Sequence, residues 1–82
     1  MESIIISAMD NTTIAQMIRK GLPDAEVTVR GDDGVHFEAV VRCMSFEGKP
    51  TLARHRMVYA TLGELMGNEI HALGLTTELP EK

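Results

Sequence analysis

The first clear hydrophobic pattern lies near the N-terminus and has the spacing of a helix. Apolar residues recur three and four positions apart, as on one helical face: Ile14, Met17 and Ile18. Thr13, with Gln16 three positions later, has the form of a capping box at the helix start. Gly21 and Pro23 predict the helix end, because glycine adopts the left-handed closing conformation and proline cannot continue a helix. A short helix is expected here.

Two later stretches alternate between apolar and polar residues, which is the period of half-buried strands. Residues 25–30 place Val27 and Val29 on one face, opposite Glu26, Thr28 and Arg30. Residues 36–43 do the same, and their expected core face is Phe37, Ala39, Val41 and Cys43. The intervening Gly-Asp-Asp-Gly at 31–34 is typical of a tight turn, because Asp and Gly tolerate positive φ. Together they predict an antiparallel hairpin.

A longer helix is expected at about residues 51–66, after the break at Gly48 and Pro50. Its apolar stripe consists of Leu52, His55, Val58, Tyr59, Leu62, Leu65 and Met66. Arg54, Met57, Thr61 and Glu64 lie away from this stripe, and Arg56 lies at its edge. Gly67 and Asn68 predict the helix end. A third strand follows at about 70–77, and residues 78–82 form a short polar tail.

The order helix, strand, strand, helix, strand predicts an α+β domain with a KH-like layout. A right-handed helical crossover would place the third strand parallel to the second, giving a three-stranded mixed sheet with both helices on one face. The 82 residues are expected to form a single domain, 1–82, with one small core. Residues 1–10 include Ile4, Ile5 and Ile6, favour an extended conformation, and are expected to be an N-terminal extension.

The charge distribution is uneven and bears on possible partners. The net charge is −4, which argues against strong general affinity for nucleic acids or anionic membranes. Residues 42–56, however, carry four basic residues against one acidic residue. Three of these basic residues are candidate contacts for an acidic protein partner or for a nucleic acid: Lys49, Arg54 and Arg56.

The compartment is predicted from the single cysteine and from the absence of targeting signals in the sequence. Cys43 alone cannot form an internal disulfide, so a reducing compartment is expected. No apolar run approaches the roughly 20 residues that cross a bilayer. The apolar run at residues 4–6 has no basic segment before it, so a signal peptide is not expected. These features predict a cytoplasmic protein that has no membrane contact.

Catalytic patterns are missing from the sequence, which predicts a protein that is not an enzyme. There is no nucleophile elbow, Walker loop or dinucleotide fingerprint. Asp32 and Asp33 are adjacent in a turn and do not suggest an acid–base pair. His55 falls inside an apolar stripe and is expected to be partly buried with a satisfied ring nitrogen, whereas Cys43 is expected to behave as a small core hydrophobe. The three His and one Cys match no structural zinc spacing.

Three segments resemble signatures of the BolA-like family. Residues 46–62 contain an aromatic-x-Gly loop, Phe46-Glu47-Gly48, followed by His55-Arg56-Met57-Val58-Tyr59 and then Leu62. Residues 70–73, Ile-His-Ala-Leu, are similar to the second signature, and residues 35–37, Val-His-Phe, to the start of the second strand. The resemblance covers about residues 13–77 in the correct order. The short turn at 31–34 resembles that of the short-loop bacterial branch.

This resemblance implies a class II KH-like fold and a non-enzymatic adaptor. Family members pair with a monothiol glutaredoxin and share a 2Fe-2S cluster, which implies a role in iron–sulfur trafficking or in iron or stress regulation. His71 matches the family's histidine ligand, and imidazole is a suitable ligand for iron. Residues 31–34 contain no His or Cys, so His36 is the nearest candidate for a second ligand. Alternatively, His71 shares strand parity with Leu73 and Leu75 and is a hydrogen-bonded residue at the sheet rim.

Two further hypotheses remain open. The KH-like layout and the basic segment favour a DNA-binding transcriptional regulator, a role that the resemblance also implies. The Gly31-x-x-Gly34 sequence does not support it, because it joins two strands and both intervening residues are acidic, and an aromatic stacking platform is missing. The other hypothesis is a structural interaction module that forms a homodimer when its partner is absent.

Overall fold

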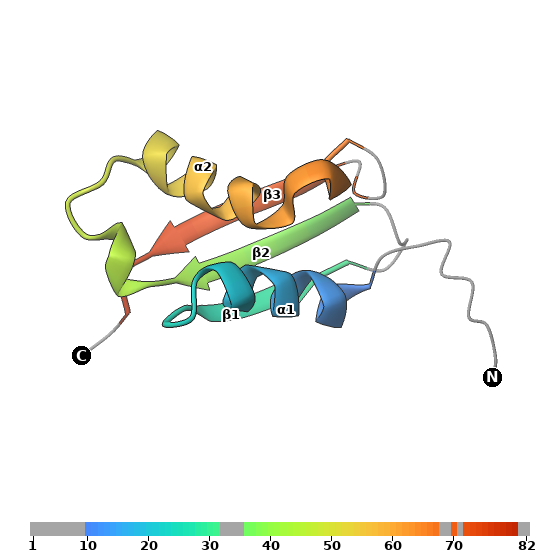
Figure 1. Cartoon of the computed structure of the whole chain (residues 1–82), viewed down its shortest axis with the longest axis horizontal. Helices are drawn as coiled ribbons and strands as arrows, with labels where there is room; N and C mark the ends of the chain where they lie inside the picture. The colour runs from blue at the N-terminus through green and yellow to red at the C-terminus, as the bar shows by residue number, and fades with distance from the viewer. Residues whose placement is uncertain (1–9, 32–35, 68–69, 71, 81–82) are drawn as a thin grey trace, which may run out of the picture.

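The computed structural model describes residues 10–31, 36–67, 70 and 72–80. The main elements are α1 (Asn11–Gly21), β1 (Glu26–Arg30), β2 (His36–Arg42), α2 (Thr51–Leu62) and β3 (Ala72–Glu78) (Figure 1). Two single-turn 3-10 helices, η1 (Met44–Phe46) and η2 (Gly63–Leu65), precede and follow α2. This order confirms the predicted α+β arrangement. The predicted N-terminal extension lies outside the described residues except for Asp10.

The three strands form one sheet in the order β1-β2-β3. β1 and β2 are antiparallel, with Val27 opposite Val41, and β2 and β3 are parallel, with Phe37 opposite Leu73. These directions confirm the predicted antiparallel and parallel strand pairs. The predicted turn at residues 31–34 lies outside the described residues except for Gly31. β3 begins at Ala72, two residues later than expected, and Ile70 forms only an isolated bridge with Met66.

The hydrophobic core lies between the sheet and the two helices. The predicted inward face of β2 is confirmed, since all four of its residues are buried: Phe37, Ala39, Val41 and Cys43. The helices contribute Ile14 and Ile18 from α1 and Val58 and Leu62 from α2. Polar residues alternate with the core residues along the strands, so the other face of the sheet is open to solvent.

The start of α1 differs from the predicted capping box. The N-cap is Asp10, whose Oδ1 accepts a hydrogen bond of 2.8 Å from the backbone N–H of Thr13. This hydrogen bond stabilises the ionised carboxylate and lowers the pKa of Asp10. The helix therefore begins at Asn11, because an aspartate at the N-cap pairs a backbone donor that the first turn leaves unpaired.

The end of α1 also differs from the prediction, because Gly21 is helical and does not have a positive φ. Its role is steric. A Cβ atom at Gly21 would lie 2.5 Å from Cγ2 of Thr61 in α2, so only glycine permits this approach of the two helices. Leu22 closes the helix, with its backbone N–H donating to the carbonyl of Ile18.

The predicted apolar stripe of α2 is confirmed at Val58 and Leu62, which are buried, but its edge differs from the prediction. Leu52, expected in the core, is 62% exposed, whereas Met57 and Thr61 are half-buried. Thr61 faces α1, where it lies against Gly21. The α-helix ends at Leu62, four residues earlier than expected, where Gly63 takes a φ of 55°. None of the helices in the described ranges has the length and hydrophobicity needed to cross a bilayer.

Candidate functional site

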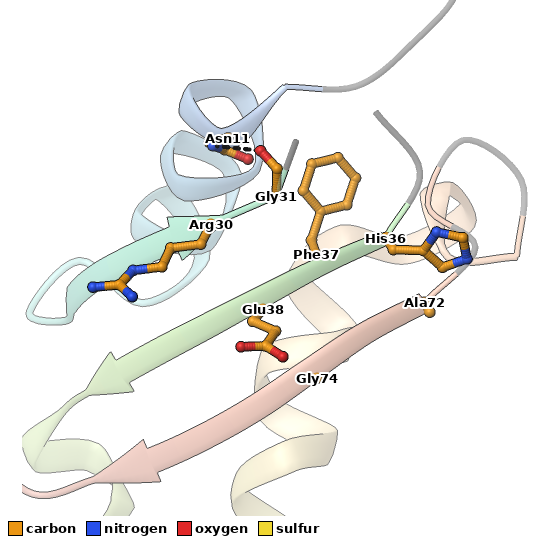
Figure 2. A pocket seen from close by; sticks show the side chains of 8 residues that line it. All are labelled: Asn11, Arg30, Gly31, His36, Phe37, Glu38, Ala72 and Gly74. Atoms are coloured by element: carbon orange, nitrogen blue, oxygen red, sulfur yellow. Dashed lines mark hydrogen bonds between the residues drawn. The ribbon is translucent and has the colours of Figure 1, made fainter. Parts of the chain in front are cut away.

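His36 lies at one end of the sheet, where β2 begins. Its side chain is exposed and faces away from the buried Phe37, as strand parity predicted. Ala72, the first residue of β3, is its partner in the parallel register. Figure 2 shows the imidazole beside the start of β3. Of the two predicted metal ligands, His36 is therefore the one whose position the structure describes.

The other predicted ligand, His71, lies outside the described residues. Its sequence neighbours on either side differ in environment: Ile70 is fully buried, and Ala72 is exposed. Leu73 is buried, and its carbonyl accepts a 3.0 Å hydrogen bond from the hydroxyl of Tyr59. This hydrogen bond links the start of β3 to α2.

An open hollow lies beside His36 at this end of the molecule (Figure 2). It reaches from the start of α1 across the ends of all three strands, and its lining residues are Asn11, Arg30, Gly31, His36, Phe37, Glu38, Ala72 and Gly74. The small side chains of β3 leave it open, since a Cβ atom at Gly74 would meet only Cγ of Glu38, at 3.7 Å. Among the described residues, no three or more His, Cys, Asp or Glu side chains gather closely enough to hold a metal ion.

The floor of this hollow is fixed by close packing around Gly31. A Cβ atom there would lie 2.6 Å from Cδ1 of Phe37, so the glycine backbone rests directly on the ring. Asn11 Nδ2 donates a 3.3 Å hydrogen bond to the carbonyl of Gly31, which links α1 to the end of β1. Asn11 Oδ1 is buried and accepts no hydrogen bond from the described part of the chain.

The hollow also contains charged residues that were not predicted as site residues. Arg30 and Glu38 are partners in the antiparallel register of β1 and β2, and both are exposed on the open face. Their outward parity was visible in the sequence, and the hairpin register would have paired them. Without a chemical motif, nothing in the sequence marked this pair as part of a site.

The predicted basic contacts behave differently from one another. Lys49 and Arg56 are exposed, as a contact residue requires. Arg54 is half-buried and is engaged within the molecule, since its Nε donates a 2.8 Å hydrogen bond to the carbonyl of Lys49. Its guanidinium also lies 5.8 Å from the centre of the Phe46 ring. Arg54 therefore braces the loop that leads into α2.

The predicted metal residue and the predicted basic residues do not form one site. β2 runs from His36 towards η1, and α2 runs back in the opposite direction (Figure 1). The segment between η1 and the first turn of α2, which contains Lys49 and Arg54, therefore lies at the far end of the sheet from the start of β2. This separation follows from the parallel crossover that the element order predicts.

The remaining candidate side chains have the structural roles expected of them. Cys43 is completely buried, and its thiol donates a 3.2 Å hydrogen bond to Oδ1 of Asp24. His55 is half-buried on α2. The predictions of a core cysteine and a partly buried histidine are confirmed, whereas the pairing of the His55 ring nitrogen stays a prediction.

Comparison with known proteins identifies the family. The family model for BolA-like proteins matches residues 11–82. The structure of a BolA homologue from Coxiella burnetii has a TM-score of 0.79 and 48% identity, covering 88% of this chain and 92% of that one. An uncharacterised Acinetobacter guillouiae protein, named for the rpoN-murA intergenic region, is 31% identical over 75 residues, which cover 90% of this chain and 89% of that protein.

A shorter match involves the Escherichia coli protein named DNA-binding transcriptional regulator BolA. The two are 45% identical over 42 residues, which cover 51% of this chain and 40% of that protein. The chain spans 33% to 40% of the length of the first curated relatives that it matches. The short-loop bacterial branch stays a prediction. The family model, however, covers most of the sequence, and the chain belongs to the BolA-like family.

Proposed function

We propose that this protein is a non-enzymatic adaptor that pairs with a monothiol glutaredoxin and shares a 2Fe-2S cluster with it, in iron–sulfur trafficking or in iron or stress regulation. The observation that carries the proposal is the exposed position of His36 at the start of β2, in a chain that belongs to the BolA-like family. Its exposed side chain lies in register with Ala72, the residue that directly follows His71 in the sequence.

The number of available ligands supports a shared cluster over one held by this chain alone. A 2Fe-2S cluster takes four protein ligands, and two of them can be histidines on one iron. Among the described residues, no group of three or more metal-ligating side chains is present, and Cys43 is buried. His36 and His71 would supply two imidazoles, and thiolates from outside the chain would complete the set. When bound, such a cluster would supply a one-electron centre whose potential is raised by imidazole ligation.

The residues at this end of the sheet also favour binding over catalysis. The exposed side chains around His36 are Glu38 and Arg30, which offer charge and hydrogen bonds to a docked protein. The cysteine, which is the strongest nucleophile in the sequence, is sealed in the core against Asp24. We therefore assign this end of the sheet to partner and metal binding.

The proposal is tested by mixing the purified protein with a cluster-loaded monothiol glutaredoxin and recording visible absorption and circular dichroism. The wild type is expected to change the cluster spectrum, and His71→Ala is expected to lose that change. His36→Ala should reduce it. His55→Gln is the matched control, because it removes an imidazole from α2 and not from the sheet end. A spectrum that responds equally to all three variants would refute the ligand assignment.

A second candidate function is DNA binding. It is supported by the name of the Escherichia coli relative and by the exposure of Lys49 and Arg56. We expect phosphate contacts to give binding that falls steeply with salt concentration, and Lys49→Ala with Arg56→Ala to flatten that dependence. Arg54→Ala is a poor test because it also removes the brace of the loop. Absence of any preference for one sequence over random DNA at physiological salt would exclude a specific regulator.

A further inference from the structure

The outer face of α2 carries apolar and basic side chains. Leu52, Arg56 and Ala60 are spaced four residues apart, so they share one helical face, and all three are exposed. The buried Val58 and Leu62 lie on the opposite side of the helix. We call Leu52, Arg56 and Ala60 the outer stripe. Arg56, expected at the edge of the buried face, lies at the centre of this exposed face.

Comparison with α1 sets the outer stripe apart from an ordinary solvated helix face. Both helices cover the same sheet, but the exposed side chains of α1 are all polar: Thr12, Gln16, Arg19 and Lys20. Leu52, at 62%, is more exposed than the other large exposed hydrophobic residues of the described chain, which are Val40, Met44 and Leu79. A single exposed leucine needs no explanation. An apolar pair that flanks a cation on one helical face indicates a contact surface.

The charge of α2 indicates the kind of partner. Residues 51–62 contain Arg54, His55 and Arg56 and no Asp or Glu, although the whole chain has a net charge of −4. Arg54 is engaged with Lys49 and Phe46, so Arg56 is the arginine that α2 presents to solvent. Its neighbours on the stripe are apolar. One cation between apolar side chains suits a carboxylate on a protein better than a nucleic-acid backbone, whose binding requires several phosphate contacts.

We propose that the outer stripe docks an acidic amphipathic helix of a partner protein. Leu52 and Ala60 would contact apolar side chains of that helix, and Arg56 would pair with a carboxylate. Close approach is possible because Ala60 is small and exposed. His36 lies on the open face of the sheet, opposite the helices, so both surfaces can be used at once. The inference does not depend on the cluster proposal.

Nuclear magnetic resonance titration of the isotopically labelled full chain tests this docking directly. The probe is a synthetic helical peptide with Leu and Glu along one face, and the control peptide has the same composition in shuffled order. We expect saturable shifts centred on residues 52, 56 and 60 with the first peptide only. Arg56→Glu should weaken binding at least tenfold and should create binding to a peptide with Lys in place of Glu. Leu52→Ala should weaken binding several-fold.

Lys20→Glu is the matched control, because it makes the same charge change on the exposed face of α1. If it weakens binding as much as Arg56→Glu, the effect is one of net charge and the proposal fails. The proposal also fails if millimolar peptide causes no shifts on α2, or if the shuffled peptide binds equally. Shifts of the stripe that depend on protein concentration without peptide would assign the surface to a second copy. If duplex DNA shifts the resonances of the outer stripe and the acidic peptide does not, the stripe is a nucleic-acid contact and the proposal fails.

Discussion

At the scale of single residues, a few side chains pair backbone groups at the borders of helices and strands. Asp10 accepts from Thr13 at the start of α1, Tyr59 donates to Leu73 near the start of β3, and Arg54 donates to Lys49 before α2. Each contact pairs a backbone group near the start of an element that the regular hydrogen bonds of that element do not all satisfy.

The Asp10 cap should make stability dependent on pH in the acid range. Its pKa is lowered from the ordinary value of 3.8 by the hydrogen bond from the Thr13 backbone, so the folded state binds its proton less readily than the unfolded state. The stabilisation is therefore present above pH 3.8 and is lost as the pH falls through the lower pKa of the folded state. Denaturation curves measured from neutral to acid pH should show this loss in the wild type. Asp10→Asn keeps a capping acceptor without a titrating group, so an identical acid loss in this variant would contradict the assignment.

The hydroxyl of Tyr59 should contribute measurably to the attachment of β3. Tyr59→Phe removes the donor to the Leu73 carbonyl and should lower the free energy of unfolding by about 0.5–1.5 kcal/mol, as measured by urea denaturation. The control is Glu78→Gln, which breaks the ion pair to Arg42. The side chains of Arg42 and Glu78 are both more than a third exposed, so Glu78→Gln should lower the free energy of unfolding by less than about 1 kcal/mol. Equal effects of the two variants would argue against a special role for Tyr59.

At the scale of elements, the close approach of α1 and α2 sets the orientation of α2. Gly21 has no side chain, and Thr61 occupies the space where its Cβ would lie. The Thr61 hydroxyl donates to the Val58 carbonyl within its own helix, so the methyl group points to α1. On the same helix Val58 is buried and Leu52 is exposed, so the outer stripe lies on the side of α2 away from the core.

A double-mutant cycle between these helices measures the contact. Gly21→Ala should destabilise the protein by about 1–3 kcal/mol, because the new Cβ would force the helices apart. Thr61→Ser removes the methyl group and keeps the hydroxyl, so Gly21→Ala should destabilise this variant less than it destabilises the wild type. Relief should be partial, since Cβ of residue 61 would still lie 3.0 Å away. A cost that is the same in both backgrounds would show that the two residues do not interact.

The elements could be predicted from the sequence to different degrees. The faces of β2 were correct because a period of two leaves one assignment, with Phe37 and Val41 inside. The face of α2 was largely correct, since Val58 and Leu62 are buried, but Leu52 at the margin of the stripe is exposed, and a helical wheel alone does not decide such marginal positions. The cap at Asp10 was missed because Thr13 and Gln16 matched a familiar motif.

The candidate site was less predictable than the fold. His36 was placed correctly on an exposed strand face, because parity alone determines its side. Arg54 and Arg56 are two residues apart on a helix, and only the position of Phe46 shows that one braces a loop while the other faces solvent. The charged pair Arg30 and Glu38 carried no motif. His71, recognised through its family signature, lies outside the described residues.

At the scale of the whole molecule, Cys43 should report on global unfolding. Its thiol is completely buried directly after β2, and its backbone N–H donates to the carbonyl of Glu78, the last residue of β3. We expect iodoacetamide to react slowly with the native protein and rapidly in urea. Gly21→Ala should accelerate native labelling about tenfold for each 1.4 kcal/mol of stability lost. Fast labelling of the native wild type would instead reveal local opening where β2 and β3 end.

The strand order has a consequence for synthesis of the protein on the ribosome. β2 is the central strand of the described sheet, and β3, which pairs with it from His36 to Arg42, is translated after β1 and β2. Until β3 emerges, the nascent chain has one edge of β2 uncovered and lacks Leu73 from its core. Such an intermediate exposes hydrogen-bonding groups and apolar surface that invite pairing with other nascent chains. Chaperones that bind emerging polypeptides are therefore expected to hold this protein until β3 is released.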